Sequence, residues 1–194
     1  MHEYTFSHSK RQRVWIVLFV IAVAISLAYR WIVSMFPILE IPSYLEGPSI
    51  LTMYGVLAWF YETKLWNKKY KRLRFSSMPD YNGCWRGTIH SSYNGGTDVP
   101  CELIVKQTWL TMSCELRTQS SRSYSIQAAV SEEVGLTHGL TWYYVNNPKN
   151  TSGIGMHMHF GVTHATMNGD SMECEYFNRS KDRDTYGTIE LKRK

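Results

Sequence analysis

The sequence predicts an N-terminal hairpin of two transmembrane helices followed by an all-β domain, an eight-stranded up-and-down antiparallel β-barrel. Two apolar runs, at residues 14–36 and 48–66, predict the hairpin. Short segments that alternate apolar and polar residues with a period of two predict the barrel. We therefore divide the chain into a membrane part, residues 1–75, and a barrel, residues 76–194, long enough for one compact domain.

The first apolar run is long enough to cross a bilayer. As a helix, residues 14–36 span roughly 34 Å, against a hydrocarbon core of about 30 Å. Ala22 lies four residues before Ser26, and Ala24 lies four residues before Ala28. Such small-residue pairs allow another helix to approach closely. A helix rich in alanine also contains such pairs by chance. The pairs can therefore mark a helix-packing face or have no role.

The second apolar run is shorter. Residues 49–66 span roughly 27 Å as a helix, and Trp59, Tyr61 and Trp66 suit the membrane interface. Arg30, the one charged residue inside the first run, lies near its far end. There it can reach the headgroups, or it can have a role in the membrane.

The positive charge is concentrated in the membrane part. Residues 1–75 carry ten Lys and Arg against four Asp and Glu, whereas residues 76–194 carry eleven against twelve. The positive residues flank the two runs and the connecting loop is acidic, so the positive-inside rule predicts a multi-pass membrane protein whose N-terminus and barrel are cytoplasmic. A near-neutral barrel is not expected to bind DNA or RNA nonspecifically.

The barrel is predicted from eight short segments separated by turn residues. Asn168-Gly169 is a strong signal for a tight hairpin. Sequential antiparallel strands of this length favour a closed barrel, which leaves no exposed sheet edge. The predicted strands are 83–91, 99–109, 110–118, 123–132, 137–145, 154–166, 171–178 and 185–192.

Alternation along these strands predicts which side chains point into the barrel. Trp85, within the sequence Gly83-Cys84-Trp85-Arg86-Gly87, is expected to close one end. The predicted inward residues are Met112, Cys114, Leu116, Tyr124, Ile126, Ala128, Val130, Met172, Cys174, Tyr176, Ile189 and Leu191.

The four cysteines are expected to be free thiols. None is part of a Cys-x-x-Cys pair, so the usual zinc spacing is absent. A cytoplasmic barrel is in a reducing compartment, which disfavours disulfides. The four are Cys84, Cys101, Cys114 and Cys174.

No catalytic or metal site is predicted. His157 and His159 share one face of a strand, but no carboxylate or thiol partner is evident, and His138 or His164 would be needed to complete a site. The other face, with Met156, Met158 and Phe160, is expected to be the core side. Without a constellation of nucleophile, base and oxyanion donors, we expect neither an enzyme nor a cofactor.

Aromatic and arginine residues are the candidate ligand-binding groups. Trp142 and Tyr144 share a face with Leu140, as core residues or as a platform on which a nucleobase stacks. An eight-stranded barrel can hold one small ligand, and guanidinium groups bind phosphate. The candidate ligand-binding residues are Trp142, Tyr144, Tyr176, Arg122 and Arg179.

The chain resembles a known family. Two predicted membrane helices, a basic segment and a β-rich domain that opens with Pro79-Asp80-Tyr81-Asn82-Gly83-Cys84-Trp85-Arg86-Gly87 are similar to the SMODS-associated two-transmembrane, β-strand-rich effectors of bacterial CBASS anti-phage defence. The resemblance covers nearly the whole chain, and the architecture is its most specific part.

The resemblance implies a function. The barrel would bind a cyclic di- or trinucleotide made by a partner cyclic-oligonucleotide synthase, and the chain would then form homo-oligomers. The assembled helices would disrupt the lipid bilayer of the bacterial inner membrane and cause abortive-infection cell death.

Two other functions compete with this one. A membrane-tethered, lipocalin-like barrel would bind lipid and should have a uniformly apolar interior. A structural anchor would dock a protein partner through an exposed apolar patch.

Overall fold

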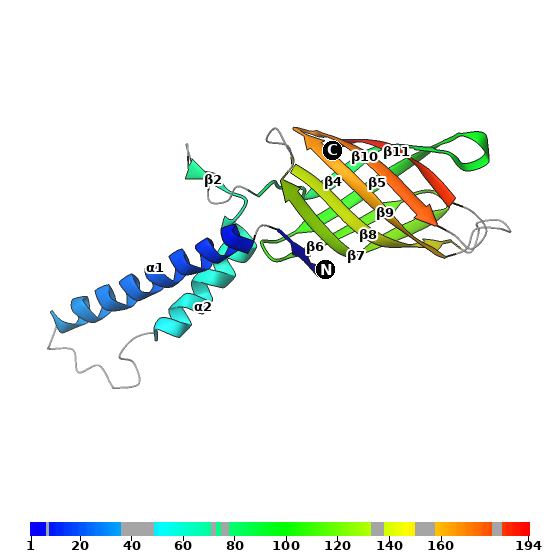
Figure 1. Cartoon of the computed structure of the whole chain (residues 1–194). Helices are drawn as coiled ribbons and strands as arrows, with labels where there is room; N and C mark the ends of the chain where they lie inside the picture. The colour runs from blue at the N-terminus through cyan, green and yellow to red at the C-terminus, as the bar shows by residue number, and fades with distance from the viewer. Residues whose placement is uncertain are drawn as a thin grey trace. The chain divides into compact units, whose positions relative to one another are not determined.

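The computed structural model describes residues 1–6, 8–35, 49–70, 73–74, 78–132, 138–149, 158–179 and 184–194 (Figure 1). The chain forms two compact units. One contains Met1–Phe6 together with Met78–Lys194, and the other contains Ser7–Ser77. The first six residues therefore belong with the β-rich part, although the predicted division assigned them to the membrane part.

The helical unit is built around two helices. Helix α2 is capped by Ser49, whose Oγ accepts a hydrogen bond from the backbone N–H of Thr52 at 3.1 Å, a standard N-cap arrangement. The elements of this unit are α1 (His8–Ser34), α2 (Ile50–Phe60), the π-helical turn η2 (Tyr61–Leu65) and two short paired strands, β2 (Lys69–Tyr70) and β3 (Leu73–Arg74).

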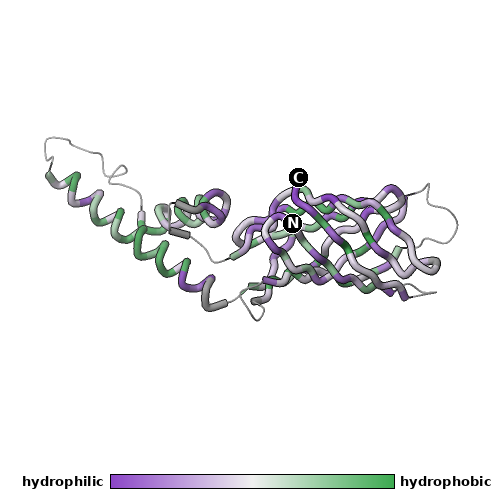
Figure 2. Tube along the Cα trace, turned by 90° about the horizontal axis from the view of Figure 1, so that it is seen from above, coloured by the Kyte–Doolittle hydropathy of each residue, from purple (hydrophilic) through white to green (hydrophobic). Residues whose placement is uncertain are grey.

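One helix among the described residues has the length and composition of a membrane span. It covers Arg11–Ser34 within α1, and only 17% of its most apolar window is buried. The core helix of a soluble protein would bury much more, and Figure 2 shows hydrophobic residues along the length of this helix, as in a membrane span or a signal sequence. The predicted second span is not confirmed, because α2 has 11 residues.

The two helices pack against each other through a face of small residues. Ala22 and Ser26 are buried on α1. Phe19 of α1 contacts Tyr54 of α2 edge-on, with ring centroids 6.0 Å apart. One of the two predicted small-residue pairs therefore packs within the chain, whereas the other pair is exposed on α1.

The β-rich unit is a closed barrel. Eight strands follow each other as an antiparallel meander, and the pairing of β11 with β4 closes it. These strands lie close to the eight that were predicted. They are β4 (Gly83–Ser91), β5 (Thr97–Gln107), β6 (Thr111–Arg117), β7 (Ser121–Glu132), β8 (His138–Pro148), β9 (His159–Asn168), β10 (Ser171–Arg179) and β11 (Asp184–Arg193).

A ninth strand, β1 (His2–Thr5), completes the barrel between β6 and β7 (Figure 1). It runs antiparallel to β6, with His2 opposite Met112. It runs parallel to β7, with Tyr4 opposite Ala128. The prediction of an eight-stranded, purely up-and-down barrel is therefore confirmed only in part, because the described residues of the barrel form nine strands, with one parallel pair.

The two ends of the barrel differ in their filling. Because neighbouring meander strands are antiparallel, the end of one strand and the start of the next lie at the same end of the barrel. At the end where β4 begins, large side chains fill the interior, and Trp85, Trp109 and Met112 are fully buried. At the opposite end the interior is hollow and contains a cavity.

Trp85 closes the filled end, as predicted. Its indole Nε1 donates a hydrogen bond to the carbonyl oxygen of Tyr81 at 3.0 Å, and the Arg193 guanidinium lies 4.4 Å from the centre of its ring. Gly87 is required nearby, since a Cβ there would lie 1.7 Å from the carbonyl oxygen of Glu190 on the neighbouring strand.

Two of the predicted face assignments are wrong. Tyr124 and Ile126 point outward and are exposed, because β7 has a bulge between Ser125 and Gln127 that shifts the alternation by one residue. After the bulge, Ala128 is buried as predicted.

In β9 the core side is the opposite of the predicted one. Met158 and Phe160 are exposed, whereas Thr163 and Ala165 are buried. Pairing with β8 determines this orientation, because Thr163 lies opposite the buried Trp142. His159 therefore points into the barrel, whereas Met156 lies outside the described residues.

The cysteines are free, as predicted. Cys101, Cys114 and Cys174 are buried in the interior. Cys84 is only half-buried, and its thiol donates to Oε1 of Glu102 at 3.1 Å.

Candidate functional site

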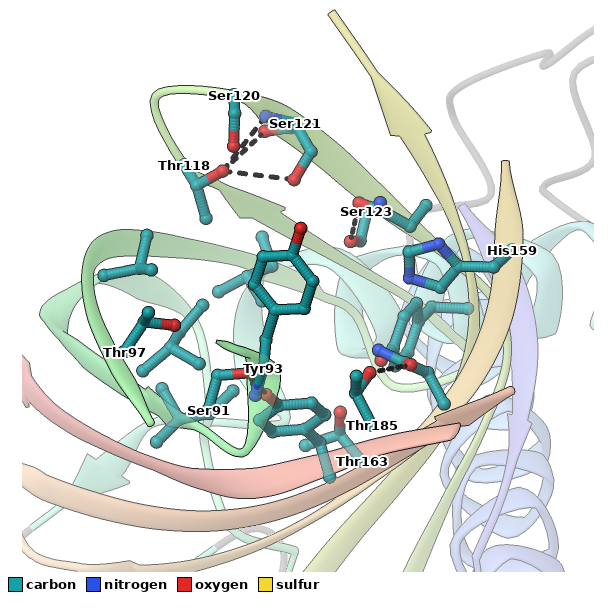
Figure 3. A pocket seen from close by; sticks show the side chains of 18 residues that line it. Ser91, Tyr93, Thr97, Thr118, Ser120, Ser121, Ser123, His159, Thr163 and Thr185 are labelled. Carbon is teal, nitrogen blue, oxygen red and sulfur yellow. Dashed lines mark hydrogen bonds between the residues drawn. The ribbon is translucent and has the colours of Figure 1, made fainter. Parts of the chain in front are cut away.

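The hollow end of the barrel encloses a cavity of about 170 Å³. All eight meander strands, or the turns between them, contribute to its wall, so the closure of the sheet creates it (Figure 3). The lining residues are Ile89, Ser91, Tyr93, Thr97, Val99, Leu116, Thr118, Ser120, Ser121, Ser123, Tyr144, Asn146, His159, Thr163, Tyr176, Asn178, Thr185 and Ile189.

Most of the side chains on this wall carry a hydroxyl, amide or imidazole group, and four are aliphatic. The Ser123 hydroxyl donates to Oδ1 of Asn146 at 2.8 Å, and the Tyr176 hydroxyl donates to Oγ of Ser91 at 2.7 Å. The Thr185 hydroxyl donates to Oδ1 of Asn178. Figure 3 shows these polar side chains arriving from several strands, so the cavity offers hydrogen-bond donors and acceptors on many sides.

Tyr144 is the most buried aromatic side chain on the cavity wall, with 6% of its surface exposed. Burial raises the pKa of its hydroxyl to about 12, although a hydrogen bond with Asn178 opposes this shift. Gly161 makes room for the ring, since a Cβ there would lie 2.4 Å from the Tyr144 hydroxyl. At neutral pH this hydroxyl is therefore protonated and able to donate.

None of the described residues that line the cavity is Lys, Arg, Asp or Glu. A cation nevertheless lies beside the rim. The Nζ of Lys149 donates to the carbonyl oxygens of Thr118 and Gln119 at 2.8 and 2.7 Å. The described lining of the cavity therefore mixes polar groups with apolar carbon and carries no Lys, Arg, Asp or Glu, and positive charge lies at the turn between β6 and β7.

The five predicted ligand-binding residues occupy three different environments. Tyr144 and Tyr176 line the cavity. Trp142 is 2% exposed and lies one inward position before Tyr144, in the packed core. Arg122 and Arg179 point outward and are exposed, and Arg179 lies 3.7 Å from Asp184, an exposed ion pair of little energetic weight.

The sequence did carry a signal for two lining residues that were not predicted. Asn146 is two residues after Tyr144, and Asn178 is two residues after Tyr176. Side chains two apart on a strand share a face. Extending the alternation by one step would therefore have identified both amides.

The structure contains no metal cluster among the residues it describes. His159 faces the cavity, whereas His164 lies five positions along β9, and its Nδ1 is 2.8 Å from the Thr141 hydroxyl. His157 lies outside the described residues.

The lipid-binding alternative is weakened by the polar side chains on the cavity wall, since it required a uniformly apolar interior.

Comparison with known protein families gives a match to most of the chain. Residues 76–193 match the family described as "Cap15, cyclic dinucleotide receptor domain". That description is of a receptor and not of an enzyme.

Three similar proteins carry the name "CD-NTase-associated protein 15". The chain is 33% identical over 141 residues to the protein from Yersinia aleksiciae, covering 72% of this chain and 66% of that protein. It is 33% identical over 90 residues to the protein from Escherichia albertii, covering 46% and 44%. It is 28% identical over 133 residues to the protein from Staphylococcus schleiferi, covering 69% and 70%.

The chain spans slightly less than two thirds of the Yersinia protein and less than half of the Escherichia protein. The family match, by contrast, covers most of this chain and almost all of the barrel. The chain therefore belongs to the Cap15 cyclic dinucleotide receptor family of CBASS proteins, the family predicted from its resemblance.

Proposed function

We propose that this chain is a membrane-anchored receptor that binds a cyclic dinucleotide in the hollow end of its barrel. The observation that carries the proposal is the cavity itself. It combines tyrosine rings with amides and hydroxyls, and it lies within the segment that matches the receptor family. Rings that stack on bases and polar groups that bind base edges and phosphate oxygens are the features such a ligand requires.

The size of the cavity indicates how the ligand is held. An apolar cavity of about 150 Å³ accommodates benzene, so a cavity of about 170 Å³ accommodates one nucleobase. A complete cyclic dinucleotide is closer to the larger ligands that occupy roughly 300–1,000 Å³. In this proposal one base enters the cavity, and the sugar-phosphate ring lies at the mouth.

The lining residues have distinct roles in this arrangement. Tyr144 and Tyr176 contact the inserted base, and the amides of Asn146 and Asn178 bind its edge. Trp142 lies beneath the wall and holds Tyr144 in place. These amides can each donate and accept hydrogen bonds, which suits a base edge.

The arginines contribute from outside the cavity. Arg122 and Arg179 are exposed at the cavity end of β7 and β10. Together with Lys149 they raise the local concentration of an anionic ligand, which accelerates association. A cavity without charged lining residues would leave the barrel with little affinity for nucleic acids in general.

The position of β1 supports a two-crossing membrane topology. The chain leaves the barrel after Phe6 and returns to it at Met78. Both points are parts of one folded unit, so they lie on the same side of the membrane. If α1 crosses the bilayer, the chain between these points must cross an even number of times, which requires a return segment.

The return segment in this proposal is α2 together with η2. Ile50–Leu65 spans roughly 24 Å as a helix, somewhat less than the bilayer core of about 30 Å. A short span thins the bilayer locally or favours association. With the basic residues on the barrel side, the positive-inside rule makes that side cytoplasmic and the membrane the bacterial inner membrane.

The output is proposed to be membrane disruption. Binding of a cyclic dinucleotide, made by a partner synthase, would promote self-association of the barrels. The attached hairpins would then gather in the inner membrane, disrupt it and kill the infected cell. This sequence of events gives the short second span a function.

Calorimetric titration of the full chain in detergent tests the receptor step. The full chain is needed because residues 1–6 supply a strand of the barrel. Tyr144→Phe removes one hydroxyl from the cavity, and Tyr143→Phe removes one from the outer face of the same strand. We expect Tyr144→Phe to weaken binding about 5- to 10-fold, as for one lost hydrogen bond, and Tyr143→Phe to bind as the wild type does.

Failure to bind any member of a panel of cyclic di- and trinucleotides would refute the receptor function. Fatty acid or phospholipid extracted from the purified chain would then support the lipid-binding alternative. Equal affinity of the two tyrosine variants would place the ligand elsewhere on the barrel.

A further inference from the structure

The outer wall of the barrel carries an apolar surface on one side only. Eight large hydrophobic side chains are exposed on strands β7 to β11, counting Met158, which directly precedes β9. We define the outer belt by six of them: Tyr143, Met158, Phe160, Val162, Phe177 and Tyr186. Tyr124 and Ile126, on either side of Ser125, extend it onto β7.

The belt is continuous across neighbouring strands. Val162 lies between Tyr143 on one side and Phe177 on the other, and Phe177 is opposite Tyr186. The rings of Tyr143 and Phe160 are stacked, with centroids 5.7 Å apart and planes 7° from parallel. These side chains therefore form one surface and are not scattered single residues.

The opposite wall has a different character. Among the described residues of β4–β6, no large hydrophobic side chain is exposed. The outer faces of these strands instead carry ion pairs, Arg86 with Glu102 at 2.9 Å and Arg117 with Glu115 at 2.7 Å. The apolar wall is thus a local feature of β7–β11 and not a general property of this barrel.

We propose that the outer belt is the surface through which two copies of this chain associate. The exposed fractions of its residues run from 37% to 65%. With about 200 Å² for a large side chain, the belt and its extension expose roughly 750 Å². A standard interface buries about 800 Å² on each partner, whereas a typical monomer exposes patches of only a few hundred Å².

The belt is bordered by one acidic and one basic residue, which can pair with each other between two copies of the chain. On the outer face of β10, Glu175 precedes Phe177 by two residues and Arg179 follows it by two. A two-fold axis through Phe177 reverses the strand direction in the partner, so Arg179 of one copy meets Glu175 of the other.

The belt shares its strands with the cavity. Tyr143, Val162 and Phe177 alternate along the chain with Tyr144, Thr163 and Tyr176, which line the cavity on the inner face. A single layer of backbone therefore separates the ligand from the second copy. The inference deepens the proposed function, and its connection with the ligand rests on that function.

Association of the full chain in detergent tests the belt. Phe177→Glu places a charge at its centre, and Lys106→Glu places one on the outer face of β5 as a matched control. By light scattering over a range of protein concentrations, with and without a cyclic dinucleotide, we expect Phe177→Glu to reduce association at least 10-fold and Lys106→Glu to leave it unchanged.

A cysteine at the centre of the belt gives a second measurement that does not depend on destabilising the interface. Val162→Cys should form disulfide-linked dimers on mild oxidation, whereas Lys106→Cys should not. Wild-type association by Phe177→Glu, or equal cross-linking at both positions, would overturn the proposal. If Phe177→Glu loses only binding to lipid vesicles, the belt is a membrane contact and the proposal is wrong.

The two proposals can fail separately. A chain that binds no cyclic dinucleotide but cross-links through Val162→Cys would refute the receptor function and retain the belt. A chain that binds the ligand and does not associate through the belt would do the reverse.

Discussion

The strand β1 can be tested through one side chain, Tyr4. It is 2% exposed, and its hydroxyl donates toward the carbonyl oxygens of Thr108 and Trp109 at 3.1 and 3.2 Å. The hydroxyl also accepts a hydrogen bond from Nε2 of Gln107 at 3.3 Å. Tyr4 therefore attaches β1 to the turn between β5 and β6, in addition to the strand pairing.

Tyr4→Ala should destabilise the barrel strongly. Replacing a buried aromatic side chain by alanine costs about 3–5 kcal/mol, a large part of the roughly 5–15 kcal/mol that stabilises a domain. At about 3 °C for each kcal/mol, the thermal midpoint should fall by roughly 10–15 °C. The loss should be this large only if β1 is a structural strand of the barrel and not a tail lying on its surface.

The measurement is thermal unfolding of the full chain in detergent, followed by near-ultraviolet circular dichroism of the buried aromatic residues. Thr5→Ala is the matched control, since Thr5 is the next residue of β1 and is exposed. It should change the midpoint by no more than about 2 °C, as expected for a surface substitution. Equal midpoints for the wild type and Tyr4→Ala would refute the assignment of β1 to the barrel and, with it, the argument for an even number of membrane crossings.

Three further predictions concern the interior. Gly161→Ala should weaken binding of a cyclic dinucleotide more than 10-fold in calorimetry, because the new Cβ would occupy the place of the Tyr144 ring; unchanged affinity would contradict the proposed site. Ligand at about 100 times its dissociation constant should add about 2.7 kcal/mol to the free energy of unfolding and raise the thermal midpoint by roughly 8 °C, and no shift for a ligand that binds would show that it does not bind the folded barrel. Burial raises the pKa of Cys114 from 9.0 to about 12, so only the unfolded chain releases this proton as the pH rises above about 9. The free energy of unfolding should therefore decrease between pH 9 and 12, by about 2 kcal/mol at pH 10.5 from this thiol alone. In Cys114→Ala this decrease should be smaller.

The eight meander strands could be predicted because each alternates with a clear period and ends at turn residues. The pattern fails locally where the backbone departs from regular pairing. At the bulge between Ser125 and Gln127, one extra residue reverses the facing of the residues before it. In β9 the side chains of Met158 and Phe160 are more apolar than those of the inner face. Apolar character alone therefore selected the wrong face.

The strand β1 could not be predicted for a different reason. Its four residues have no period long enough to recognise, and they directly precede an apolar helix. The pairing partners of β1 lie more than 100 residues away in the sequence. Only the gap between β6 and β7 in the closed barrel creates the position that it fills, and that gap is a property of the whole sheet.

The candidate site was predicted in part. Aromatic character correctly drew attention to two residues on the cavity wall, but it also selected Trp142, which lies deeper. The serines and threonines of the wall are unremarkable in sequence, and they become a site only because barrel closure brings the ends of eight strands together. Whether a polar residue lines a cavity depends on where the packed core stops, which alternation does not encode.

The strand β7 connects the features that the proposed function requires. Near its start, Ser123 lines the cavity and donates to Asn146 on β8. Further along, the Ser125 hydroxyl accepts a hydrogen bond from the backbone N–H of Cys114 at 2.8 Å and lies 2.7 Å from Nε2 of His2. Beyond the bulge, β7 pairs with β1, and two residues separate β1 from α1. One strand thus runs from the cavity to β1, the strand that precedes α1. In the proposed function, a ligand that displaces Ser123 would act on the same strand that pairs with β1.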